Sequence, residues 1–239
     1  MHRALDPARI IETLERLQAR IAERFPEAGL GKVCDDLVVT ARETAARADD
    51  LAKPHWALRI TVFALIALGL VAQFAAARFF PVSIGEMKAS ELAQGLDSAV
   101  NLLILFGGAI WFLITLEERL KRRRALDALH QLRQFAHVID MHQLTKDPTI
   151  ILTPHKATQA SPARRPMSRF ELTRYLDYCA EMLALIGKLA ALYGEHARDG
   201  VVIDAINDVE NLTGNLGRKI WQKITIIGVL EEREPPIPG

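Results

Sequence analysis

The sequence predicts an all-α protein made of two transmembrane helices and a cytoplasmic helical bundle. Two apolar runs without a charged side chain, Ile60 to Ala77 and Ser98 to Leu116, predict the transmembrane helices. A helix rises about 1.5 Å per residue, so each run would reach roughly 27–29 Å and match a hydrocarbon core of about 30 Å. In the rest of the chain apolar residues recur at helical spacing, and no alternating strand pattern occurs.

These patterns divide the 239 residues into consecutive segments. The bundle is expected to combine an N-terminal helical hairpin with three C-terminal helices, the first of which continues the second transmembrane helix. In chain order the expected segments are a cytoplasmic helical hairpin at 1–54, a first transmembrane helix at 57–80, a short periplasmic or extracellular connector at 81–97, a second transmembrane helix at 98–118, a cytoplasmic continuation helix at 119–146, a proline-rich linker at 147–167, a C-terminal helical pair at 168–228 and a disordered tail at 229–239.

The N-terminal hairpin has a clear first helix. Asp6 and Pro7 suit an N-cap and a first helical position. The apolar residues that follow keep one helical stripe: Ile10, Leu14, Leu17 and Ile21. Pro26 and the Gly29-Leu30-Gly31 triplet interrupt this pattern, so the second helix is expected from Lys32 to Ala52.

The C-terminal pair has the best local signal of the whole chain. Ser168 and Glu171 have the spacing of a capping box, which predicts a helix from there to about Tyr193. Apolar residues from Val202 onward predict a last helix that ends at about Ile227. Gly214 and Gly217 weaken this last helix by about 1 kcal/mol each relative to Ala.

Basic residues flank the apolar runs and predict the orientation of the chain. Arg59 precedes the first run, and the second run is followed by Lys121, Arg122, Arg123 and Arg124. Lys and Arg accumulate on the cytoplasmic side, so both termini are expected in the cytoplasm, in a bacterial inner membrane, with the lipid bilayer as a partner. A net charge of +1 and few aromatic residues argue against nucleic-acid binding.

Small residues on one face of the first run predict self-association. Gly69, Ala72 and Ala76 stand at positions i, i+3 and i+7 of that run. Small residues let another helix approach closely, although Gly and Ala are also simply common in membrane helices. We therefore expect a homo-oligomer with a coiled-coil-like helical bundle, and an unidentified cytoplasmic protein as a further partner.

No constellation of residues predicts an enzyme or a cofactor. The sequence has no phosphate-binding loop, dinucleotide fingerprint, nucleophile elbow or kinase motif set. His137 and Asp140 share a helical face and are weak metal candidates, because a site needs three or four converging ligands. A polar bundle surface or a helix end explains them more simply. Cys179 lies among apolar residues and is predicted to be a core thiol, not a nucleophile.

Two features of the last helix have alternative interpretations. Trp221 lies in a basic amphipathic stretch, for which core packing is favoured over contact with lipid headgroups. An acidic and amide cluster is interpreted as a solvated helix face, with polar contacts to Arg218 and Lys219, or to Arg164 and Arg165, as the alternative. The cluster consists of Asp204, Asn207, Asp208, Glu210 and Asn211.

Three functions are compatible with these patterns. The first is a two-pass membrane protein that acts as a homo-oligomeric interaction, signalling or scaffold module. The second is an oligomeric pore-forming effector or channel gated by the cytoplasmic bundle, with Gln73 and Asn101 lining an aqueous path. The third is a membrane-tethered metal-dependent enzyme that uses His137 and Asp140.

Overall fold

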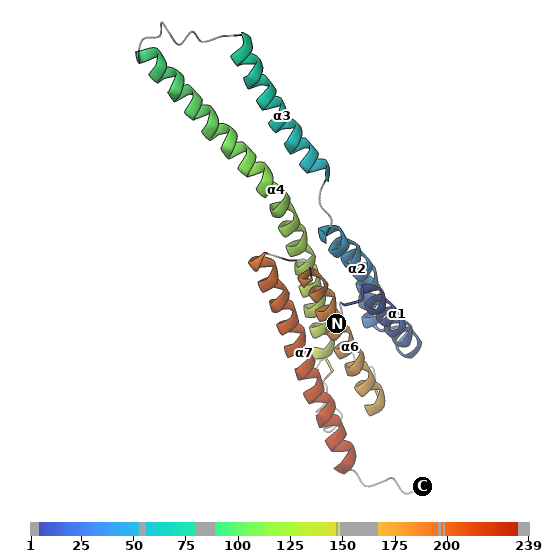
Figure 1. The fold of residues 1–239 in the computed structure, drawn as a ribbon. Coiled ribbons are helices and arrows are strands. Elements are labelled where there is room, and N and C mark those ends of the chain that lie inside the picture. Colours follow the sequence, from blue (N-terminus) through green and yellow to red (C-terminus); the bar gives the residue numbers. More distant parts are fainter. Residues whose placement is uncertain are drawn as a thin grey trace, which may run out of the picture. The chain divides into compact units, whose positions relative to one another are not determined.

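The computed structural model describes residues 5–52, 56–79, 89–146, 148, 167–195, 197 and 199–233. All regular structure within these residues is α-helical, which confirms the all-α prediction. Figure 1 shows the six helices of this part of the chain. They are α1 (Pro7–Arg24), α2 (Gly29–Ala52), α3 (Trp56–Phe79), α4 (Ala89–Leu144), α6 (Arg169–Gly194) and α7 (Gly200–Arg233).

The prediction of two transmembrane helices, at 57–80 and 98–118, is wrong. Within the described residues, none of the helices combines the length and the apolar character that a membrane crossing requires. A crossing needs about 20 consecutive, mainly apolar helical residues, and the described parts of α3 and α4 do not meet that condition. The predicted inner-membrane location and membrane topology are corrected with it.

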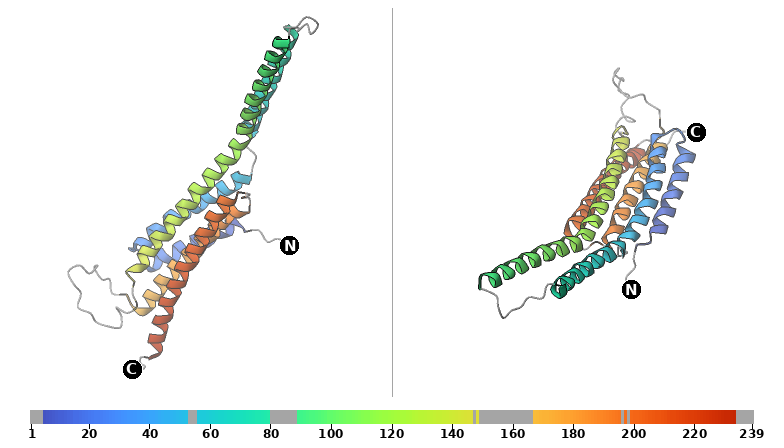
Figure 2. Two further views of the ribbon diagram at one scale, coloured as in Figure 1. Left: turned by 90° about the vertical axis from the view of Figure 1, so that its left-hand side faces the viewer. Right: turned by 90° about the horizontal axis from the view of Figure 1, so that it is seen from above.

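The chain forms two compact units. Unit 1 comprises Met1–Ala52 and Arg124–Gly239, and unit 2 comprises Lys53–Arg123. Unit 1 contains α1, α2, α6, α7 and the last part of α4, whereas α3 and the first part of α4 belong to unit 2. In Figure 2 the helices of unit 1 lie alongside one another, with α6 between α7 and the α1–α2 pair.

Helix α4 runs without interruption from Ala89 to Leu144. The sequence contains no proline in this range, so nothing interrupts the backbone hydrogen-bond ladder. The helix therefore joins the segments expected at 98–118 and 119–146, and it begins inside the connector expected at 81–97. Residues 81–88 of that connector, and most of the linker expected at 147–167, lie outside the described residues.

Helices α1 and α2 form the N-terminal hairpin. The Asp6 side chain accepts a hydrogen bond from the Ala8 amide at 3.0 Å, which confirms the predicted cap, and the predicted stripe of α1 is buried. Helix α2 begins at Gly29, earlier than the expected Lys32. The side chain of Leu30 is fully buried in the core, which offsets the cost of two glycines in the first turn.

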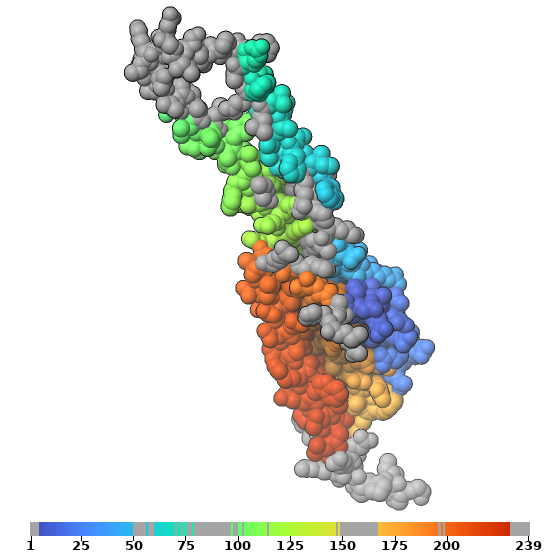
Figure 3. All heavy atoms as spheres, viewed as in Figure 1, coloured from blue at the N-terminus to red at the C-terminus, as the bar shows by residue number. Residues whose placement is uncertain are grey.

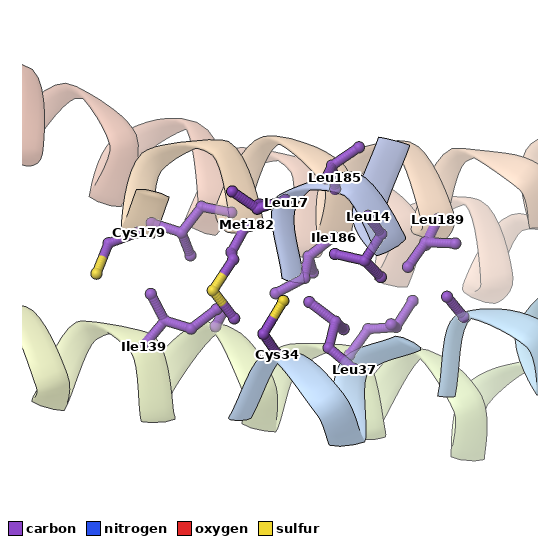
Figure 4. Close-up of a cluster of buried hydrophobic side chains, with 14 of the residues drawn as sticks. Leu14, Leu17, Cys34, Leu37, Ile139, Cys179, Met182, Leu185, Ile186 and Leu189 are labelled. Atoms are coloured by element: carbon purple, nitrogen blue, oxygen red, sulfur yellow. The ribbon is translucent and has the colours of Figure 1, made fainter. Parts of the chain in front are cut away.

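The capping box at the start of α6 is present as predicted. The Ser168 hydroxyl accepts from the Glu171 amide at 3.2 Å, and the Glu171 carboxylate accepts from the Ser168 amide at 2.7 Å. The Ser168 amide and then the Ser168 hydroxyl, which both donate to this carboxylate, lower the pKa of Glu171 because they stabilise its ionised form. The helix that starts here is buried on most sides and meets side chains of α1, α2 and α4 in the core (Figure 4).

Lys223 of α7 forms hydrogen bonds with the C-terminal end of α4. Its ammonium donates to the backbone oxygen of Gln143 at 3.0 Å and to the side-chain oxygen of the same residue at 2.6 Å. The amide nitrogen of Gln143 in turn donates to Asp140 Oδ1 at 2.6 Å. A cation at this position also interacts favourably with the helix dipole, so α7 and α4 stabilise each other here. Helix α7 extends beyond the predicted end at Ile227 to Arg233, into the segment expected to be a disordered tail.

We predict opposite effects of one substitution at two glycines of unit 1. A Cβ at Gly187 of α6 would lie 3.0 Å from Thr213 Oγ1 of α7, whereas a Cβ at Gly217 would meet nothing within 4 Å. Gly187→Leu is expected to lower the free energy of unfolding by about 1–3 kcal/mol through overpacking. Gly217→Leu is expected to raise it by roughly 0.5–1 kcal/mol through helix propensity. Urea unfolding followed by circular dichroism measures both, and equal effects would contradict the observed α6–α7 packing.

Candidate interaction surface

Unit 2 exposes its large apolar side chains instead of burying them. Among the described residues of unit 2, Val62 is the one side chain that is buried. More than half of the large apolar side chains that are exposed in the described chain lie in this unit. Contiguous apolar patches of more than a few hundred Å² are rare on the surfaces of soluble monomers, which makes this surface the candidate interaction surface.

One set of the exposed side chains on α3 follows a helical stripe, and Thr61, Ala64, Leu65, Leu68 and Ala72 are exposed outside it. Its large members are 62–76% exposed, and Ala67, which is also exposed, falls in the same register. The spacings between these positions are three or four residues, the pattern of a seam that packs against another helix. The stripe consists of Trp56, Ile60, Phe63, Ala67, Val71 and Phe74. We call it the α3 stripe.

The predicted small-residue face of this helix contacts α4 at Gly69. Gly69 lies directly against the ring of Phe106 in α4, where a Cβ would be 2.7 Å from the Cζ atom. Its close approach is therefore made by a helix of the same chain. Ala72 is exposed, and the side chain of Ala76 lies outside the described residues. The α3 stripe was not recognised in the sequence because nearly every residue around it is also apolar, which hides the period.

Most of the basic residues predicted to flank a membrane lie where unit 2 ends, at Arg123, and the second segment of unit 1 begins, at Arg124. Lys121 forms an ion pair with Glu117, one turn earlier, at 3.0 Å. Arg122, Arg123 and Arg124 are exposed. Arg59 belongs to α3, and its side chain lies outside the described residues. Their predicted role loses its basis together with the spanning helices.

The metal candidates do not converge. His137 is exposed on α4, and the Asp140 carboxylate accepts the hydrogen bond from Gln143 described above. His142 lies against Gly29 of α2, where burial and then the charge of Lys146 lower its pKa. In the described part of the chain no group of three or more His, Cys, Asp or Glu side chains is arranged to hold a metal ion.

Unit 1 has an open groove of about 870 Å³ between the start of α1 and the middle of α6. Its acidic groups already have partners: Asp6 caps α1 and pairs with Arg9 at 3.4 Å, and Glu181 pairs with Arg20 at 2.5 Å. The remaining lining is largely apolar. The lining residues are Leu5, Asp6, Arg9, Ile10, Thr13, Glu181, Ala184, Leu185 and Lys188.

Trp221 of α7 is 56% exposed, so the prediction that it packs in the core is wrong. The buried face of α7 is formed by other residues, including Ile220 next to it in the sequence. Phe170, in the first turn of α6, is also exposed, and the guanidinium groups of Arg24 and Arg174 lie 5.1 and 5.6 Å from its ring centre. An aromatic ring in an amphipathic helix can lie on its buried or its exposed side, and packing against neighbouring helices determines which.

Comparison of this chain with models of known protein families, with curated proteins and with solved structures finds no significant match. The functional argument therefore depends on the surface of the protein itself. On that surface the α3 stripe carries more exposed apolar side chains than a separate, water-exposed helix ordinarily does.

We predict that both cysteines are unreactive in the folded protein. Cys34 and Cys179 are fully buried, and burial raises the pKa of each thiol from an ordinary 9.0 to about 12. Because the thiolate is the reactive form, a soluble disulfide reagent at pH 8 should label neither residue until urea unfolds the chain, and then label both. Rapid labelling of either thiol in the folded protein would contradict this core.

The same pKa values predict how stability depends on alkaline pH. In the unfolded chain the thiols ionise near 9.0, whereas in the folded chain they keep their protons up to about 12. The unfolded state therefore releases protons first, and the free energy of unfolding should fall as the pH rises from about 9 towards 12. Urea titrations at several pH values measure this fall, and replacing Cys179 with Ala should reduce it.

Proposed function

We propose that this protein is a self-associating helical scaffold in which unit 2 pairs with unit 2 of a second copy. The observation that carries the proposal is the exposure of the α3 stripe along the described length of α3. Unit 1 has a buried hydrophobic core of its own, and in such an assembly one unit 1 would be attached to each paired unit 2.

A second copy is the occupant that matches this surface best. The sequence from Ile60 to Ala77 contains no charged residue, so charge cannot select a different partner there. An apolar stripe with spacings of three and four residues packs well against an identical stripe, because the side chains of one helix fill the spaces between those of the other. Most oligomers of identical chains use such a self-complementary interface.

The energy available from this contact is sufficient for a stable pair. Fully burying a Phe, Val or Ile side chain contributes about 1.5–3 kcal/mol. The two phenylalanines of the stripe, Phe63 and Phe74, are 71% and 76% exposed and would therefore be its main anchors. Aromatic side chains also dominate the energetics of measured interfaces.

We predict that Phe63→Gln together with Phe74→Gln weakens self-association by at least about a hundredfold, because each copy then buries two polar amides at the seam. The matched control is Leu65→Gln with Leu68→Gln, which changes two exposed leucines of α3 outside the stripe. Analytical ultracentrifugation of the full chain over a range of concentrations measures the dissociation constants, with a mild non-ionic detergent at one fixed concentration to suppress aggregation.

The expected result is a self-associated wild-type chain, a dissociated stripe variant and a control close to wild type, with equal helix content in all three by circular dichroism. A monomeric wild-type chain at all concentrations would refute the proposal. Equal weakening in the stripe variant and the control would show that general apolar adhesion, not the α3 stripe, causes the association.

A further inference from the structure

The outer face of α7 in unit 1 has a symmetry that the α3 stripe does not explain. Seven positions on this face are spaced by four, three, four, four, three and four residues, so the spacing is the same read from either end. Gly214 is the central position. All seven are exposed in the structure, and in Figure 3 α7 lies along the surface of unit 1. The positions are Ile203, Asn207, Glu210, Gly214, Arg218, Trp221 and Thr225.

The chemistry of these positions is complementary about Gly214. Glu210 and Arg218 lie one helical turn on either side of it and carry opposite charges. One turn further out, Asn207 and Trp221 pair an amide acceptor with an indole N–H donor. An antiparallel second copy of α7 would place each member of a pair opposite its counterpart, so both ion pairs and both amide–indole pairs form at once.

Within the described residues of α7, no side chain of opposite charge pairs with Glu210 or Arg218. The residue four positions after Glu210 and four positions before Arg218 is Gly214 in both cases, so the usual helical ion-pair spacing leads to no side chain. Within the described residues neither Glu210 nor Arg218 forms an ion pair. The Arg218 guanidinium donates a hydrogen bond to Asn215, which has no charge.

The space for a second helix is present at the centre of the face. A Cβ at Gly214 would meet nothing within 4 Å, so the backbone of α7 is bare at this point. Helices pack with their axes 8–10 Å apart, and small residues at the crossing allow the closer distances in this range. Trp221 is 56% exposed and Ile203 is 41% exposed, and both are uncovered apolar side chains on the same face.

We propose that the outer face of α7, from Ile203 to Thr225, binds the same face of a second copy in an antiparallel, twofold-symmetric pair centred on Gly214. Glu210 then pairs with Arg218 of the partner subunit, and Asn207 accepts a hydrogen bond from the indole of the partner's Trp221. The contact is about 33 Å long, one helix pair wide, and weak by itself. It does not depend on the α3 stripe, although association through unit 2 would raise the effective concentration of α7.

Disulfide cross-linking of the full chain tests this pair directly. Gly214→Cys places a thiol on the twofold axis, where the two copies meet, and mild oxidation should then form a covalent dimer. Lys219→Cys is the matched control, because residue 219 is exposed but lies on another side of α7. The native cysteines Cys34 and Cys179 are buried and should not compete. We expect at least about tenfold faster cross-linking at Gly214 than at Lys219.

Charge reversal in the Gly214→Cys background tests the register. Glu210→Lys alone or Arg218→Glu alone places like charges opposite each other twice per pair, and should slow cross-linking by about tenfold. Mixing the two single variants should restore it, selectively as a mixed dimer, because opposite charges then face each other again. The double variant E210K/R218E should also restore it.

Two results would overturn the inference: equal cross-linking at Gly214 and Lys219, or single charge reversals that mixing does not rescue. The disulfide reports only on contact between two α7 helices. A failure of self-association through the α3 stripe would appear in the ultracentrifugation experiment and leave the charge-rescue pattern intact, so the two proposals can fail separately.

Discussion

The burial of α6 is the constraint on which unit 1 depends. Before its last turn this helix is exposed only along one narrow stripe, and its buried residues include no charged side chain. A helix that is apolar on nearly all sides is stable in water only when other helices surround it. Helices α1, α2, α7 and the end of α4 provide that cover, each through its own single stripe, and the capping box satisfies the first turn. The exposed stripe of α6 consists of Phe170, Arg174, Ala184 and Lys188.

Unit 2 lacks any equivalent of α6. Two helices can bury only the faces that they turn to each other, and the contact of Gly69 with Phe106 is such a place. The apolar side chains on their other faces stay exposed, at a cost of about 25 cal/mol for each Å² left in water. The hydrophobic effect buries the apolar side chains of unit 1 within one chain. The same effect therefore favours burying the exposed apolar side chains of unit 2 between two chains.

Local signals in the sequence predicted the local structure well. The caps at Asp6 and Ser168 were predictable because each depends on residues within one turn, and the stripe of α1 because its polar neighbours make the period visible. The start of α2 was missed because the burial of Leu30, which depends on other helices, outweighs the glycines on either side. Trp221 was misplaced for the same reason: its amphipathic stretch offers two apolar faces, and only tertiary packing selects one.

The surfaces proposed to be functional were harder to predict, for two different physical reasons. In the first apolar run the uniform hydropathy suggested a lipid-facing helix, and composition alone gives no information about which side chains a neighbouring helix covers. The exposure of the side chains in the α3 stripe became visible only when burial was known. The symmetric spacing on α7, by contrast, is present in the sequence, but its positions are mainly polar and a search for apolar periods passes over them.

The position of Glu210 before Arg218 along α7 could also be explained by the helix dipole. The dipole favours acids near the N-terminus of a helix and bases near its C-terminus. That effect falls off within the first and last turn, so it accounts for Asp199, which caps the start of the helix, but not for residues in its interior. Glu210 lies in the third turn from the start, and Arg218 lies about four turns before the end at Arg233. The dipole is negligible at both positions, and Gly214 between them removes the intrahelical alternative. Within the part of the chain that the structure describes, the charge order on this face is thus best matched by the same face of a second, antiparallel copy.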